Sequence, residues 1–187
     1  MDEAQIQRAL RRIAHELIET TAKDEPMYLI AIPNGGVPLA RQLAENLKEF
    51  SDVTVPVGIL DTTLYRDDLL KARSGSRPSL KGTEMPQRVD DCAAILVDDV
   101  ISTGRTIRAA LDALMDFGRP KSVRVAALVD RGHREFPIKI DFVGKNMPTG
   151  DEDSVELRGA SDEATGPLEV VVVSSAAGNE NESEVTS

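Results

Sequence analysis

The sequence contains a single cysteine, no tryptophan and no long hydrophobic run. One cysteine, Cys92, excludes an internal disulfide and a cysteine-rich zinc site. No apolar run approaches the roughly 20 residues that a bilayer crossing needs. Residues 1–4 also lack the basic and apolar regions of a signal peptide. We therefore expect a cytoplasmic protein without a membrane segment.

The net charge of -10 is distributed unevenly along the 187 residues. Residues 1–149 contain 22 acidic and 21 basic side chains, whereas residues 150–187 contain 10 acidic side chains and a single arginine, Arg158. Gly, Ser, Asp, Glu and Asn dominate the second part, which has little to bury. We expect one domain over 1–157 and an acidic, mostly disordered tail over 158–187. Within the tail, 168–173 has the apolar content of an edge strand.

Apolar periodicity predicts strands and helices that alternate along the first 130 residues. The spacing of Ile6, Leu10, Ile13 and Leu17 predicts a helix over 5–19. Two more helices are expected, one starting around Pro38 and one over 106–117, with strands at 28–32, 53–60, 93–97 and 123–129. This alternation is typical of an α/β fold whose central, mostly parallel sheet is flanked by helices.

Residues 65–88 interrupt the alternation without a sustained period of their own. A segment of this length in a compact domain is more often a functional lid than a plain connection. We interpret 65–88 as a flexible lid or hairpin arm. Its cationic residues are Arg66, Arg73, Arg77, Lys81 and Arg88.

The pattern that carries chemistry is AILVDDVISTGRT, residues 94–106. An apolar strand delivers Asp98 and Asp99 to the edge of the sheet where ligands bind in open α/β folds. The turn at 102–106 offers backbone N–H groups, hydroxyls, a glycine and the positive end of a helix, which suit a monophosphate. The carboxylates beside it suit vicinal hydroxyls. Together they indicate a site for ribose 5-phosphate.

Two other interpretations explain less of this pattern. An acidic helix N-cap would stabilise the fold but needs only one carboxylate. A Walker-type phosphate loop requires the spacing GxxxxGK[ST], which the sequence does not contain.

Residues 94–106 resemble the phosphoribosyl-pyrophosphate (PRPP) motif of type I phosphoribosyltransferases. Segments 8–16, 61–68, 128–135 and 143–146 are similar to the PyrR family of bifunctional pyrimidine operon regulators and uracil phosphoribosyltransferases. The similarity extends from about residue 6 to residue 157. It implies a type I phosphoribosyltransferase fold with a small hood. It also implies a homo-oligomer, either a dimer or a larger assembly.

This resemblance implies two activities. The first converts uracil and PRPP to UMP and pyrophosphate with Mg²⁺, which PRPP rather than a direct protein ligand would hold. The second is UMP-responsive attenuation through binding to the mRNA leader of pyrimidine genes. Asp98 and Asp99 would hold the ribose hydroxyls, and Arg66 with the arm cations would shield pyrophosphate.

The resemblance also implies the remaining site residues. The hood segment, 130–134, would lie beside the base, with 143–145 close by. The implied substrate-binding residues are Asn34, Gly35, Gly36, Val100, Ile101, Ser102, Thr103, Gly104, Arg105, Thr106, Arg131, Val143 and Lys145.

A basic stripe lies opposite the apolar face of the first expected helix. It consists of Arg8, Arg11, Arg12 and His15. A solvated charged face is the simpler interpretation, and Glu19 in the same arc supports it. The resemblance implies instead that the stripe binds RNA together with His133 and Arg134.

One departure from the family concerns Gly35, where the turn after the first strand usually carries an arginine that helps bind pyrophosphate. Glycine cannot replace the planar, permanently charged guanidinium group of that arginine. We expect weakened turnover, by about 2 to 4 kcal/mol of transition-state stabilisation, and intact UMP binding. Two alternatives remain open, a nucleotide-sensing RNA regulator without catalysis and a purine-type salvage transferase. Ser102 disfavours the second, because purine enzymes usually carry an aspartate base there.

Overall fold

The computed structural model describes every residue except 23, 34, 68–81, 160–166 and 175–187. Five parallel strands form the central sheet in the order β2-β1-β3-β4-β5, and β6 and β7 form a separate antiparallel pair. The helices are α1 (Glu3–Thr20), α2 (Gly36–Ser51) and α3 (Arg105–Leu114), with short 3-10 turns at Thr63–Tyr65 and Met115–Phe117. The strands are β1 (Met27–Ala31), β2 (Val57–Ile59), β3 (Ala93–Ile101), β4 (Ser122–Asp130), β5 (Phe142–Asn146), β6 (Ser154–Arg158) and β7 (Glu169–Val173).

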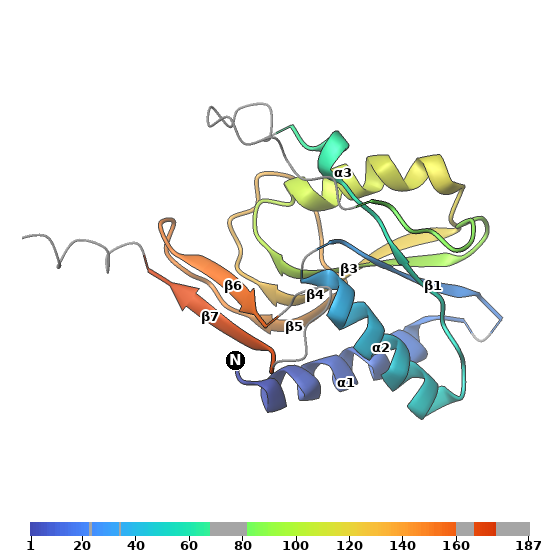
Figure 1. The fold of residues 1–187 in the computed structure, drawn as a ribbon, viewed down its shortest axis with the longest axis horizontal. Helices are drawn as coiled ribbons and strands as arrows, with labels where there is room; N and C mark the ends of the chain where they lie inside the picture. The colour runs from blue at the N-terminus through green and yellow to red at the C-terminus, as the bar shows by residue number, and fades with distance from the viewer. Residues whose placement is uncertain (23, 34, 68–81, 160–166, 175–187) are drawn as a thin grey trace, which may run out of the picture.

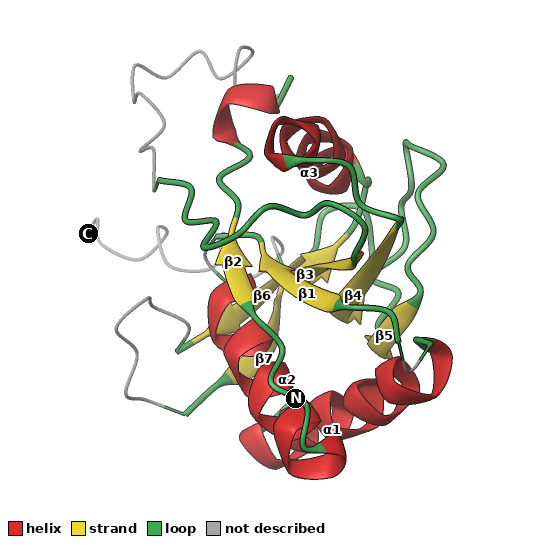
Figure 2. Ribbon diagram, turned by 90° about the vertical axis from the view of Figure 1, so that its right-hand side faces the viewer, coloured by secondary structure: helices red, strands yellow, loops and turns green. Residues whose placement is uncertain are grey.

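Helices cover both faces of the sheet, as the α/β expectation requires. Helices α1 and α2 pack on one face and α3 on the other (Figures 1 and 2). Side chains of β1 alternate between the two layers, with Leu29 facing α1 and α2 and Ile30 facing α3. None of the helices in the described part of the chain has the length and apolar content needed to cross a membrane.

Helix α1 begins where the sequence supplies a cap. The Asp2 carboxylate accepts from the Gln5 N–H at 2.7 Å, and the Gln5 side chain accepts from the Asp2 N–H at 3.0 Å. Such a capping box contributes about 1 kcal/mol to helix stability. The buried face of the helix consists of Ile6, Ala9, Leu10, Ile13, Ala14 and Leu17.

Two strands differ in length from their expected ranges. The strand expected over 53–60 shortens to β2, because Pro56 has no N–H to give to a ladder and Val53 is exposed. The strand expected over 93–97 continues to Ile101, because β4 runs beside it and pairs with it as far as Asp130. The two aspartates therefore lie inside β3 rather than after it.

The expected strand at 168–173 forms as β7 and belongs to the packed body of the protein. Val170 is buried and exchanges two backbone hydrogen bonds with Met1, at 2.6 and 2.9 Å. The expected disorder of the tail concerns mainly 160–166 and 175–187, which lie outside the described residues.

The expected arm is described at its two ends, 65–67 and 82–88. Glu84 and Ile59 exchange two antiparallel backbone hydrogen bonds of 2.8 Å, which fasten the returning end to β2. The arm cations Arg73, Arg77 and Lys81 lie outside the described residues.

The strand order places a crevice at the carboxyl ends of β1 and β3. The chain leaves β1 through α2 toward β2 on one side, and leaves β3 through α3 toward β4 on the other. In open α/β sheets, ligands bind where the strand order reverses in this way.

Candidate active site

The acid pair of β3 lies at this crevice. Asp98 is only 6% exposed, and its Oδ1 accepts from the Asp99 N–H at 3.0 Å. Asp99 Oδ1 accepts from the Val100 N–H at 2.8 Å. Burial, and secondarily the charge of Asp99, raises the pKa of Asp98 well above its ordinary value. Burial and the neighbouring carboxylate therefore both disfavour the charged form of Asp98.

Both aspartates line a pocket of about 260 Å³. Arg66 lies in its wall, where Nη1 donates to Thr106 Oγ1 at 3.1 Å. The pocket thus brings together all three expected catalytic residues with Val100 and Thr106. A cation facing two carboxylates suits a ligand that carries both hydroxyls and negatively charged groups.

The pocket is also lined by residues that the sequence interpretation did not select. Ile32 and Pro33 follow β1, and Asp61, Thr62 and Thr63 follow β2. The Asp61 carboxylate accepts from the Thr63 N–H at 2.9 Å. Their position at the carboxyl ends of neighbouring parallel strands was the signal that could have identified them.

The turn from Ser102 to Thr106 connects β3 to α3. Gly104 adopts a left-handed conformation with φ 88° and precedes α3 without a side-chain cap. The Arg105 N–H donates to Thr103 Oγ1 at 3.3 Å. Within this turn only Thr106 lines the pocket that contains Asp98 and Asp99, called the acid pocket. Ser102, Thr103, Gly104 and Arg105 lie beside it, and Ile101 is buried.

Gly35 and Gly36, which follow β1, lie directly against β3. Gly35 has an ordinary φ of -80°, so its conformation does not require glycine. A Cβ at Gly35 would, however, overlap the Asp99 carboxylate, and one at Gly36 would overlap the Val97 carbonyl. The arginine usual at this turn is therefore incompatible with the observed position of Asp99. Asn34 lies outside the described residues.

The implied base-binding residues lie away from the acid pocket. Arg131 donates to the Gly150 carbonyl at 3.2 Å, and Val143 packs against the apolar layer on the α3 face. Lys145 lines a different pocket. Strands β3 and β5 are separated by β4, which places β5 roughly 10 Å from β3. An elongated ligand would have to reach across β4 to contact both regions.

The basic stripe is exposed, as expected, but several of its side chains have partners. Arg11 forms a two-bond ion pair with Glu49 at 2.9 and 3.0 Å, and His15 stacks on Phe50. Arg12 donates to the carbonyls of Val143 and Gly144, at 3.1 and 2.6 Å.

An open pocket of about 410 Å³ lies between the stripe and β5. Three cations, Arg8, Arg12 and Lys145, line it, and none of the described lining residues is acidic. These cations come from α1 and from the edge strand of the sheet.

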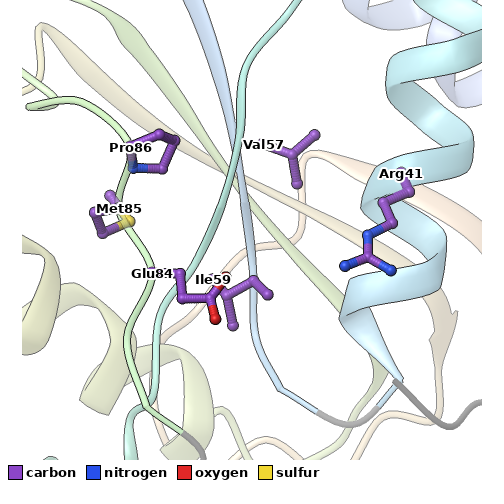
Figure 3. Close-up of a pocket in the computed structure, with 6 residues that line it drawn as sticks. All are labelled: Arg41, Val57, Ile59, Glu84, Met85 and Pro86. Carbon is purple, nitrogen blue, oxygen red and sulfur yellow. The ribbon is translucent and has the colours of Figure 1, made fainter. Parts of the chain in front are cut away.

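A third hollow, of about 420 Å³, lies at the β2 edge. Arg41 projects from α2 on one side, and Met85 and Pro86 lie on the other side of Val57 and Ile59 (Figure 3). It is larger than the acid pocket but includes none of the residues expected in the site. The acid pocket therefore remains the candidate site for phosphoribosyl chemistry.

These features define a class of enzyme. The family model described as phosphoribosyl transferase domain matches residues 2–157. Among solved structures, a hypoxanthine phosphoribosyltransferase from Trypanosoma cruzi, in a ternary complex with substrates, is similar at a TM-score of 0.70. It is 18% identical, and the alignment covers 94% of each chain. The fold is that of the type I phosphoribosyltransferases, as expected from the sequence.

Curated relatives narrow the assignment. A protein of Pelotomaculum thermopropionicum named Bifunctional protein PyrR is 49% identical over 94% of this chain and 95% of its own. Proteins of the same name from Acetivibrio thermocellus and Bacillus velezensis are 52% and 50% identical over 84% of this chain, and cover 85% and 87% of their own. The chain belongs to the PyrR family, which confirms the resemblance found in the sequence.

Proposed function

We propose that this phosphoribosyltransferase joins uracil to PRPP, releasing UMP and pyrophosphate, and that it regulates pyrimidine genes by binding their leader RNA in response to UMP. The observation that carries the enzymatic half is the pocket in which Asp98 and Asp99 face Arg66 and Thr106. The regulatory half draws on the family, whose members bear the name bifunctional, and on the cationic pocket beside α1.

The reaction needs positioning and charge stabilisation rather than a protein nucleophile. The bond between the anomeric carbon and pyrophosphate breaks and a bond to the uracil N1 forms, through a ribosyl cation-like transition state. The proton of N1 is released in this step. Asp98 and Asp99 would accept hydrogen bonds from the ribose hydroxyls and stabilise the developing positive charge. Arg66, oriented by Thr106, would stabilise the negative charge of the leaving pyrophosphate.

The donor set fits magnesium held through the substrate. Mg²⁺ binds proteins through one or two carboxylates plus substrate phosphates, and Asp61, Asp98 and Asp99 line the pocket. When bound with PRPP, Mg²⁺ would neutralise pyrophosphate charge. The described residues contain no preformed group of three or more His, Cys, Asp or Glu side chains suited to a metal. We therefore propose that PRPP provides most of its ligands.

Uracil with PRPP is expected to yield UMP, and hypoxanthine with PRPP to yield no nucleotide. UMP alone is expected to raise the melting temperature by mass action. Asp99→Asn combined with Thr103→Val removes an acceptor for ribose and a hydroxyl from the turn at 102–106, the proposed phosphate turn. This double variant should lose both UMP formation and the UMP-induced melting shift, measured by product chromatography and calorimetry.

The matched control is Asp52→Asn with Thr54→Val, which makes the same chemical changes at two exposed residues beyond the end of α2. It should behave as wild type. Unchanged UMP affinity in the Asp99 variant would overturn the assignment of the site. UMP binding without product formation would favour the regulator without catalysis, and product from hypoxanthine would favour the purine transferase.

RNA binding is expected to depend on the cationic pocket and to weaken steeply with salt, since each neutralised phosphate releases counterions. Arg8→Gln and Lys145→Gln should each weaken binding to a pyrimidine-gene leader hairpin and reduce the salt slope by about 1. The control is Lys121→Gln, which removes an exposed cation that lies directly before β4 and does not line the cationic pocket. Filter-binding titrations over a salt series measure both quantities.

The same titration tests the response to UMP. A coupling of about 1 to 3 kcal/mol between UMP and RNA is typical of linked sites.

Removal of the acidic residues 176–187, which lie outside the described residues, should leave the affinity for RNA unchanged or raise it. If Arg8→Gln and Lys145→Gln bind RNA as tightly as wild type, with no response to UMP, the regulatory half of the proposal is wrong.

A further inference from the structure

The Arg134 side chain cross-links two segments instead of facing solvent. It is 23% exposed, and its guanidinium makes an ion pair with Asp130 at 2.8 Å. It also donates to the carbonyls of Ser102 at 2.5 Å, Gly132 at 3.2 Å and Ile138 at 3.1 Å. Three of these bonds hold the hood segment and the residues just after it, and the fourth fastens them to the phosphate turn.

Neighbouring contacts make the same connection. The N–H groups of Glu135 and Phe136 both donate to the Thr103 carbonyl at 3.0 Å. Arg105, in the phosphate turn, donates to the Glu135 carboxylate at 2.8 Å and lies over the Phe136 ring. The hood segment and the phosphate turn therefore form one hydrogen-bonded unit.

The exposed part of this unit is held in a costly conformation. His133 has φ 58°, in the left-handed region that non-glycine residues rarely adopt. Its ring contacts the Thr149 carbonyl at 2.8 Å and the Asp151 carboxylate at 3.0 Å. Such a conformation persists only when its surroundings fix it, and Arg134 binds the carbonyl of Gly132 directly before it.

We propose that Arg134 is a positioning residue for RNA recognition, and that it shapes the hood segment around His133 rather than contacting an RNA phosphate. This inference rests on the proposed RNA-binding function. The planar guanidinium group of arginine has several N–H donors in fixed directions, which suits four acceptors. Lysine instead carries a single compact charge on a flexible side chain. Charge alone is therefore insufficient for the role of Arg134.

The first measurement is a filter-binding salt series with the leader hairpin. Arg134→Gln and Arg134→Lys should weaken RNA binding to a similar degree, at least tenfold, and leave the salt slope unchanged. Arg8→Gln is the contact control, because it should reduce the slope by about 1. Rescue of affinity by Arg134→Lys, or a reduced slope in Arg134→Gln, would show that Arg134 contacts phosphate and would overturn the proposal.

The second measurement needs no RNA. The chain has two histidines, His15 and His133, so imidazole NMR signals can be assigned from one substitution. In both Arg134 variants the His133 signals should move toward those of free histidine, whereas those of His15, stacked on Phe50, should not. Far-UV circular dichroism and a cooperative thermal transition without ligand check that the variants are folded. Unmoved His133 signals would overturn the proposal even if the wild type bound no RNA.

Discussion

Replacing Asp98 with asparagine is expected to stabilise the fold while strongly slowing phosphoribosyl transfer. Asp98 is buried beside Asp99, and burial raises its pKa. An ionised buried carboxylate costs several kcal/mol before any ligand compensates for it. The neutral amide should raise the free energy of unfolding by about 2 kcal/mol, or the melting temperature by about 4 to 8 °C. Loss of transition-state charge stabilisation should lower kcat by about 10²- to 10³-fold.

The stabilisation is expected to increase with pH. Because folding raises the pKa of Asp98, the wild type loses stability as pH rises from the ordinary carboxyl pKa through the raised one, whereas asparagine does not titrate. Calorimetry should show a small difference near pH 4 and a large one near pH 8. Asp52→Asn, at an exposed left-handed position that asparagine tolerates, should show neither effect. A destabilised Asp98→Asn at pH 8 would contradict a raised pKa of the buried Asp98 carboxyl.

Gly35→Ala is expected to lower activity by about two orders of magnitude, because catalysis is sensitive to misplacements of about 1 Å. Its methyl group would overlap the Asp99 carboxylate and force it from the pocket. Gly35→Arg should lower activity further. This differs from the sequence interpretation, in which an arginine restores a missing cation, because that interpretation contained no information about the position of Asp99.

A double-mutant cycle tests the cause. If Gly35→Ala acts by displacing Asp99, it should cost little in an Asp99→Gly background, where the Oδ2, Cγ and Cβ atoms that the methyl group would overlap are all absent. Steady-state rates with uracil and PRPP for the four proteins measure the coupling. Additive losses would show that Gly35 acts through another contact. A gain of activity in Gly35→Arg would support the hypothesis that the glycine weakens turnover.

Much of the fold could be predicted because its signals are local. The spacing of Ile6 to Leu17 gave α1, and a fully apolar run ending in Asp98 and Asp99 gave β3 and the position of the acid pair. Strand lengths were less predictable. The extent of β3 depends on β4, its parallel partner, which no pattern within β3 encodes.

The candidate site was predicted in part. Asp98, Asp99, Arg66 and Thr106 do meet in one pocket. The stripe of α1 was correctly placed on the surface. Its two interpretations, a solvated face or an RNA-binding one, both omitted Glu49 of α2, which pairs with Arg11. Likewise, Arg134 was selected through the family resemblance, and the structure places its guanidinium group against four protein acceptors.

The sequence by itself determined the α/β class, the faces of the helices, the acid pair with the turn that follows it, and the family. Only the tertiary structure decided that Asp61 and Thr63 share the pocket with Asp98, that Gly35 presses on Asp99, and that Arg134 binds Ser102. The physical reason is the separation along the chain of the residues that interact. Helical and strand periodicities arise from neighbours within a few residues, whereas these contacts join residues far apart in the chain. Their meeting depends on the strand order, which places β1 between β2 and β3 and places β4 beside β3.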